Sequence, residues 1–206
     1  MKKKLLTILL ILCVVVPATL SAKVFDISLG PNVQFKPDFD EISSGDMGEL
    51  FGKIENYAFG ADLRMKILLA EVDLIGTFGK IGVAGSDYVE ISLLPTAGVS
   101  FDLFGFTRLG IGLGPRFRVL IDDDGDAKVL GNSGSIESWE NFGDAFIKSP
   151  LALRASVDFK LGKVWLGANY TLDTEYTFEQ YDKFDKLFSA EWTKGRFGVS
   201  LLYSFF

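Results

Sequence analysis

The chain contains no histidine and a single cysteine among its 206 residues. Histidine is the usual general base of serine and cysteine catalytic triads and the commonest metal ligand. Its absence argues against those hydrolase mechanisms and against an ordinary zinc site, although carboxylate pairs could still act as acid and base. We therefore expect neither an enzyme nor a bound cofactor. The lone Cys13 also excludes a disulfide within the chain.

The sequence lacks an apolar run long enough for a membrane-spanning helix, which needs about 20 residues. Its longest run covers residues 5–16, with three lysines before it and a proline and small residues after it as far as Ala22. This layout is typical of a secretory signal peptide. We expect residues 1–22 to be cleaved and residues 23–206 to form one domain. A lipid anchor on Cys13 is discounted, because a leucine precedes it where a small residue is expected.

Basic residues are fewer than acidic residues. The chain has 21 lysines and arginines against 27 acids, a net charge of −6, and loss of the three lysines of the leader would make it −9. Nucleic-acid-binding domains carry clustered positive charge. The composition therefore gives no indication of a nucleic-acid partner.

The most informative pattern present is a strict alternation from Val89 to Leu103, in which every second residue is apolar. A period of two is typical of a β-strand with two chemically different faces. Fifteen residues exceed the usual strand of about five or six residues in a soluble sheet. They are enough for a bilayer, which a tilted strand crosses in about 9–11 residues.

The same alternation recurs seven more times, which predicts eight strands. The other seven segments are 25–35, 57–69, 72–78, 109–119, 151–161, 164–172 and 197–205. The predicted connections are tight at 70–71, 104–105 and 162–163, and longer at 36–56, 81–87, 120–148 and 174–195. An even strand number with short turns on one side and longer loops on the other is expected of an outer-membrane barrel. A ninth strand at 187–192 would break this rule, so we assign that segment to the last loop, as a hairpin arm against Tyr176 and Phe178.

The second face of the strands combines small residues with charges in equal number. The acids are Asp26, Asp62, Asp73, Glu90, Asp102, Asp158 and Asp173, and the bases are Arg64, Lys66, Arg108, Arg116, Arg118, Arg154 and Lys160. Small side chains fit the inside of a narrow barrel, and buried charges must be compensated. We expect these fourteen residues to form an interior charge network while the apolar face meets lipid. A soluble lipocalin-type barrel, with the faces reversed, is the alternative.

Aromatic residues gather near the ends of the predicted strands, as in the girdles at membrane interfaces. On the short-turn side they are Phe25, Phe101, Phe106, Phe159, Trp165, Tyr203 and Phe205, and on the loop side Phe35, Tyr57, Phe59, Phe78, Phe117 and Tyr170. Two prolines, Pro95 and Pro115, fall opposite each other in the predicted hairpin. Each lacks a ladder donor, which predicts a shared local distortion.

These features together resemble the eight-stranded bacterial outer-membrane β-barrel family, which includes the OmpA-type, OmpX-type and OmpW-type barrels. The terminal segment Leu201–Phe206 is similar to the signal that the barrel-insertion machinery reads. The resemblance implies an all-β, eight-stranded antiparallel up-and-down transmembrane β-barrel in the outer membrane of a Gram-negative bacterium. Outer-membrane lipid and the insertion machinery would be its partners, and we expect a monomer.

Two functions remain open at this point. The first is a structural or surface-interaction barrel with a plugged interior and acidic outer loops, since the loops hold eighteen acids against seven bases. The second is an OmpW-like channel for small hydrophobic molecules, whose lining could come only from the inward apolar residues Leu68, Ile75, Leu94, Leu120, Trp165 and Leu202. Asp122, Asp124 and Asp126 form a weak calcium candidate, and a solvated acidic loop is the preferred interpretation.

Overall fold

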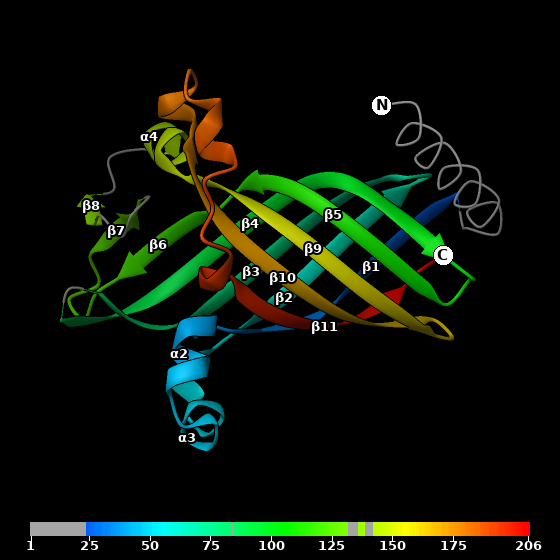
Figure 1. Cartoon of the computed structure of the whole chain (residues 1–206), viewed down its shortest axis with the longest axis horizontal. Coiled ribbons are helices and arrows are strands. Elements are labelled where there is room, and N and C mark those ends of the chain that lie inside the picture. Colours follow the sequence, from blue (N-terminus) through cyan, green and yellow to red (C-terminus); the bar gives the residue numbers. More distant parts are fainter. Residues whose placement is uncertain (1–23, 84, 132–135, 139–141) are drawn as a thin grey trace.

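The computed structural model describes residues 24–83, 85–131, 136–138 and 142–206, so the expected signal peptide lies outside the described residues. The chain forms a closed antiparallel β-barrel (Figure 1). Its strands are β1 (Phe25–Phe35), β2 (Tyr57–Ile67), β3 (Ala70–Val83), β4 (Ser86–Leu103), β5 (Thr107–Pro115) continued by β6 (Phe117–Ile121), β9 (Pro150–Leu161), β10 (Val164–Thr177) and β11 (Arg196–Ser204). Each pairs with the next, and β1 pairs with β11 to close the barrel. The predicted eight-stranded up-and-down barrel is confirmed.

The short turns lie at the end of the barrel where β1 begins and β11 ends. There Phe25 packs on Phe206, with 5.3 Å between the ring centroids. Two of the three turns match the prediction. The first does not, since β2 ends at Ile67 and Leu68 takes the left-handed conformation with φ 57°. Leu68 is therefore an exposed turn residue, 61% accessible, and not part of the lumen. Glu71, expected in the turn, instead lies in β3.

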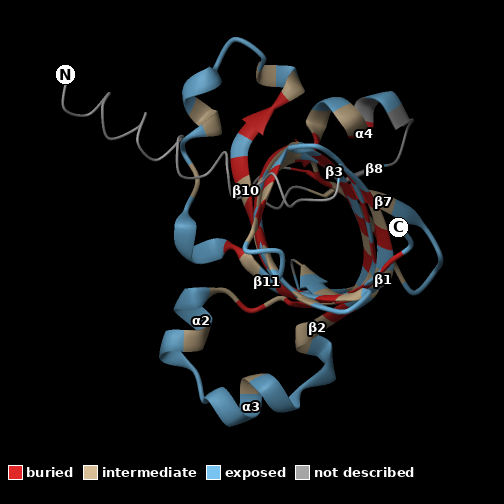
Figure 2. Cartoon of the chain, turned by 90° about the vertical axis from the view of Figure 1, so that its right-hand side faces the viewer, coloured by how far each residue is buried: buried red, intermediate tan, exposed pale blue. Residues whose placement is uncertain are grey.

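The first long connection folds into two short helices, α2 (Phe39–Ser44) and α3 (Met47–Gly52), followed by the 3₁₀ turn η1 (Ile54–Asn56). Asp38 and Asp46 cap the two helices, each accepting hydrogen bonds from backbone N–H groups of the first turn. Such caps stabilise helix starts. Viewed along the barrel, α2 and α3 lie beside the ring of strands and not over its opening (Figure 2).

The second connection is much shorter than predicted. β3 and β4 stay paired as far as Val83 and Ser86, so the expected loop at 81–87 is mostly hairpin. The alternating apolar pattern ends at Phe78, and Gly79 and Gly82 in the continuation hid the strand. Glycine is a poor strand former, which explains the error.

The third and fourth connections carry more structure. The third contains β7 (Ala127–Leu130), β8 (Ile136–Ser138) and α4 (Phe142–Lys148). The fourth contains the 3₁₀ turns η3 (Phe178–Gln180), η4 (Phe184–Leu187) and η5 (Trp192–Lys194). The expected hairpin arm at 187–192 is wrong, because this segment forms no strand and runs from the end of η4 to the start of η5. Tyr176 instead stacks on Phe184 of η4, with 5.7 Å between ring centroids. In the described part of the chain, no helix is both long and apolar enough to cross a membrane.

The two facing prolines interrupt the fifth barrel strand. β4 pairs Ala97 with Leu113 and Leu93 with Phe117, which puts Pro95 directly opposite Pro115. Neither can donate a ladder hydrogen bond. The strand divides here, and β6 pairs with β7 on its other edge, whereas β5 pairs with β9 up to Pro115. We call this point, where the β5–β9 ladder ends, the β6–β9 seam.

The two faces of the wall have opposite chemistry. The outward face exposes large apolar side chains on every barrel strand, with Ile111 58% and Val199 53% accessible. The inward face is buried and largely polar (Figure 2). Two predicted girdle residues depart from the pattern. Trp165 points inward and is 2% accessible, and Phe35 is covered by Phe51 of α3, 4.8 Å away between ring centroids.

Candidate functional site: the barrel lumen and its mouth

The structure brings most of the fourteen predicted interior residues together in the lumen. Eleven of them are buried: Asp26, Asp62, Arg64, Lys66, Asp73, Glu90, Asp102, Arg108, Arg116, Arg154 and Asp158. Of the remaining three, Arg118 and Asp173 have side chains that are 12% and 26% accessible and join the same network. Lys160 lies with Nζ 5.4 Å from the ring centroid of Trp165.

The layer nearest the short turns is organised around Arg108. Its guanidinium contacts Asp26 at 2.9 Å and Asp102 at 2.7 Å, and Lys66 Nζ reaches the same Asp102 at 2.7 Å. The ring of Trp165 lies under the guanidinium, with its centroid 4.3 Å from Cζ. This cation–π contact explains why a tryptophan occupies an inward position.

The middle layer joins strands from opposite sides of the barrel. Arg64 of β2 donates to Asp62 at 2.9 Å and to Asp158 of β9 at 2.6 Å. Arg154 of β9 forms ion pairs in the opposite direction across the barrel, with Asp62 at 3.3 Å and with Asp73 of β3. Because Arg64 is 1% accessible, these contacts lie well away from bulk solvent. Buried charges of this kind persist only when they are paired and hydrogen-bonded.

A thin apolar layer of Ile75, Leu94 and Ala152 separates this network from an upper one. In the upper layer Arg116 contacts Asp173 at 3.1 Å, and Arg118 lies 3.8 Å from the same carboxylate. Glu90 forms an ion pair with Arg196 at 3.3 Å. Of the six apolar residues considered for a channel lining, all but Leu68 are buried, yet they are spread over the height of the barrel.

Two members of the network were not predicted, Glu71 and Arg196. Glu71 was assigned to a turn, but it is in phase with Asp73 and lies 3.9 Å from Arg108. Arg196 was left between the predicted loop and the last predicted strand, but it is in phase with Ser200 and pairs with Glu90. Extending each alternation by one step would have identified both. Adding Glu71 and Arg196 to the seven predicted acids and seven predicted bases gives eight of each, so the numbers of acids and bases remain equal.

The acidic stretch of the third connection has a structural explanation. Asp122 and Asp126 close the β6–β7 turn, where the backbone N–H of Asp126 donates to Asp122 Oδ1 at 2.8 Å. Lys128 contacts the same carboxylate at 2.9 Å and lowers its pKa, chiefly through that hydrogen bond. Among the described residues, no group of three or more acids is placed to hold a metal ion. The structure thus does not gather Asp122, Asp124 and Asp126 into a ligand set.

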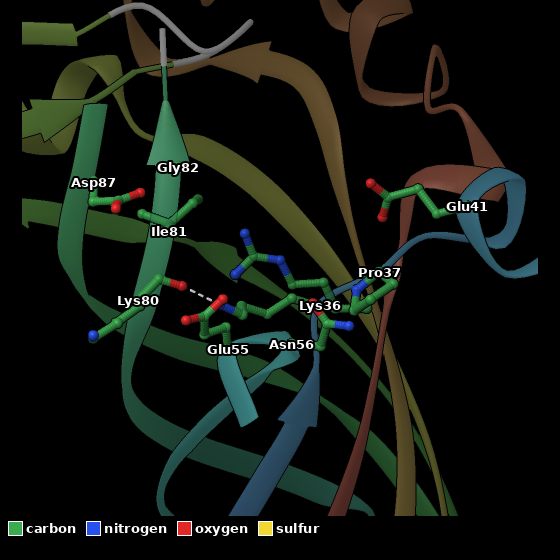
Figure 3. A pocket seen from close by; sticks show the side chains of 10 residues that line it. Lys36, Pro37, Glu41, Glu55, Asn56, Lys80, Ile81, Gly82 and Asp87 are labelled. Atoms are coloured by element: carbon green, nitrogen blue, oxygen red, sulfur yellow. Dashed lines mark hydrogen bonds between the residues drawn. The ribbon is translucent and has the colours of Figure 1, made fainter. Parts of the chain in front are cut away.

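A charged pocket of about 380 Å³ lies at the mouth, and Arg196, the partner of Glu90, is one of its lining residues (Figure 3). It is lined by Lys36, Pro37, Glu41, Glu55, Asn56, Lys80, Ile81, Gly82, Asp87 and Arg196. The Lys36 amine donates to the backbone carbonyl of Lys80, which ties the end of β1 to β3. Burial lowers the pKa of Lys36 from its ordinary value. Side chains of both signs thus surround the opening.

No protein-family model matches the chain, and no curated protein matches it in sequence. Among solved structures, the chain is similar to Ail, the attachment invasion locus protein of Yersinia pestis, solved in complex with the heparin analogue sucrose octasulfate. The TM-score is 0.45 at 16% identity, over 88% of this chain and 97% of that one. Neisserial surface protein A (NspA) gives 0.39 at 14% identity, over 88% and 96%. A closed ring of eight antiparallel strands, apolar outside and charged within, gives this chain the fold of the eight-stranded outer-membrane β-barrels.

Proposed function

We propose that the chain is a non-enzymatic outer-membrane barrel, inserted as a monomer after export and signal cleavage, whose lumen is plugged by its own ion pairs. Its role is structural or one of surface interaction through the acidic loops. The observation that carries the proposal is the inverted distribution of chemistry over the two faces of the wall. The absence of histidine from the sequence favours a role without catalysis.

The outer face supports a lipid environment. Soluble monomers rarely expose apolar patches beyond a few hundred Å², whereas this barrel exposes large apolar residues around its whole circumference. Its strands of 9–18 residues, counting β5 and β6 as one, suit a bilayer crossing, for which about 9–11 residues are needed. Water around such a wall would impose a large hydrophobic cost.

The interior contacts support a plugged lumen. Arg64 and Arg154 reach across the barrel between β2, β3 and β9, so their side chains occupy the space that an open pore would need. The interior of an eight-stranded barrel is just wide enough for side chains to fill. Arg108 on Trp165 blocks the lumen again nearer the short turns.

The loops supply the surface. Several of their acids cap helices or turns, as Asp38, Asp46 and Asp122 do, and the rest give the outer end an acidic character. Such a surface attracts cations and basic partners and repels polyanions at low salt.

One pair of measurements tests the proposal. We expect native membranes to yield a band that migrates differently before and after heating on a detergent gel, as closed barrels do. Purified protein in planar bilayers should show no steady unit conductance. Recovery of the mature chain in the aqueous fraction without detergent would contradict the membrane assignment, and steady channels would contradict the plugged lumen.

A second candidate function, passage of small hydrophobic molecules through the wall, is favoured by the β6–β9 seam. The β5–β9 ladder ends at Pro115, followed by one further hydrogen bond from the backbone N–H of Arg116 to the carbonyl of Pro150 at 2.9 Å. Three aromatic rings contact one another beside this point. Phe146 of α4 lies 5.7 Å from Phe117 of β6 and 4.9 Å from Phe178 of η3, between ring centroids. In this candidate function, a displacement of α4 away from Phe117 is the step that would open a path between the outer wall and the upper lumen.

This candidate predicts that Phe146→Ala raises uptake of a hydrophobic fluorescent dye by cells that carry the barrel, because the central ring of the stack is lost. Phe188→Ala, at an exposed ring of the fourth connection, is the matched control. Equal uptake by the wild type, the variant and cells without the barrel would remove the transport hypothesis.

A further inference from the structure

The helices of the first connection lie beside the barrel wall (Figures 1 and 2). We call residues 36–56 the flap. Aromatic contacts hold it against the barrel: Phe51 stacks on Phe35 at 4.8 Å, and Phe39 meets Phe197 edge-on at 5.0 Å. Thr193 also donates to Asp40 at 3.3 Å. The flap is therefore docked on the outer wall of β1 and β11.

Between flap and wall lies an apolar groove of about 460 Å³. Its floor is formed by Val33, Phe197, Gly198 and Val199 of the wall and its sides by Phe35, Phe39, Ile42, Phe51 and Tyr57. The one hydroxyl in this set is already used, since Tyr57 donates to the carbonyl of Phe51 at 3.0 Å. The volume falls within the roughly 300–1,000 Å³ of ligand clefts, and no free polar side chain is presented to a ligand.

The groove and the charged mouth lie back to back across one chain segment. Phe35, Phe39 and Ile42 face the groove, whereas Lys36, Pro37 and Glu41 line the mouth. This segment therefore separates an apolar environment, lined by its large apolar side chains, from a charged one. A fully solvated loop would gain no stability from three large apolar side chains on the side that faces the groove.

The position of the groove identifies its occupant. Val199 belongs both to the groove floor and to the exposed outer face of β11, where Leu201 continues the apolar surface towards the short turns. The groove therefore opens directly onto the surface that lipid covers. The flap itself exposes Met47, Phe51 and Ile54, as amphipathic segments that lie in a membrane interface do.

From this continuity we propose that the groove between the flap and the β1–β11 wall binds one acyl chain of a lipid in the surrounding membrane leaflet. The inference rests on the proposed membrane location. The lipid tail fills the apolar volume and its methylene groups replace water against Phe39, Ile42 and Val199.

The test uses the full mature barrel in vesicles of phosphatidylcholine in which a small fraction carries a photoreactive group on one acyl chain. After illumination, labelled positions are mapped by peptide mass spectrometry. We expect the flap and β11 peptides to be labelled about tenfold more than wall peptides at equal depth, the ratio that a 1.4 kcal/mol preference gives. Val199→Trp, which fills the groove, should remove this excess. Val157→Trp on the outward face of β9 is the matched control and should leave it intact.

The possible results separate the two proposals. Excess labelling that Val199→Trp abolishes, in a variant whose heat-shifted gel band shows a closed barrel, supports the groove. Uniform labelling around the wall overturns the acyl-chain site and leaves the membrane location standing. The groove is also overturned if Ile42→Trp, a second filling variant, keeps the full excess. A lack of labelling on the whole wall contradicts the membrane location itself.

Discussion

Arg64 illustrates how much depends on one side chain inside the barrel. It is fully buried and contacts three carboxylates, those of Asp62, Asp73 and Asp158. Its removal would leave several acids without their compensating charge, and an unpaired buried charge costs more than the pair itself contributes. Exposed pairs behave differently, because solvent screens both partners.

Replacing Arg64 with methionine keeps much of the volume and removes the charge. We expect this variant to lose about 3–5 kcal/mol of unfolding free energy, measured by urea titration of the heat-modifiable band. Lys194→Met, which breaks the exposed pair with Glu191, is the control and should leave stability nearly unchanged, because solvent screens this pair. Similar losses in both variants would contradict the buried role of Arg64.

The outward residues give a second prediction at this scale. Ile111→Arg places a charge on the apolar wall and should cost about 2–4 kcal/mol near the bilayer midplane. The same change at Phe188, exposed in the fourth connection, should be nearly neutral. Refolding into vesicles at a series of urea concentrations measures both. Equal tolerance at the two positions would argue that the wall does not meet lipid.

At the scale of elements, the strands were predictable, whereas the internal structure of the long connections was not. A strand that separates lipid from a polar lumen must alternate at every residue, so the pattern specifies its position and its faces. The connections obey no such constraint. Glycines concealed the upper β3–β4 hairpin, and the turn after β2 was displaced by two residues, which removed Glu71 from the predicted network. The flap helices carry clear caps at Asp38 and Asp46, but six-residue helices leave little periodicity to detect.

The β6–β7 hairpin yields a prediction about pH. Its Asp122 has a pKa lowered in the folded state by the hydrogen bond from Lys128. An acid with a depressed pKa stabilises the fold above its unfolded pKa of about 3.9, and that contribution is lost as the pH falls through the folded value. NMR titration of the hairpin amides should therefore show the turn loosening only below about pH 4.

Asp122→Asn removes the titrating group, so its hairpin should be equally loose above and below this transition. Asp124→Asn, two positions further along the same turn, is the control and should keep the wild-type profile. A transition that persists in the Asp122 variant would assign the effect to another acid.

At the scale of the whole molecule, the lumen combines charges from all parts of the sequence. Thirteen of the fourteen predicted charges join ion pairs in the lumen, and Lys160 instead contacts the ring of Trp165. Alternation alone identified them, because a charge on the second face of a strand points into the lumen. It did not identify their partners. Whether Arg64 meets Asp158 or Asp102 depends on strand tilt and stagger, which local sequence does not specify. Arg196 and Glu71 were missed for the lesser reason that the strands were drawn too short.

Closure of the barrel between β1 and β11, with Ser28 paired to Ser204, has a consequence for biogenesis. The free edge of β1 gains a hydrogen-bonded neighbour only when β11, the last strand in the sequence, pairs with it. Until then two unsatisfied edges remain open to other chains, a known route to aggregation. A chain without β11 would lack this closing pairing, so the free edges of β1 and β10 would be available to pair with other chains.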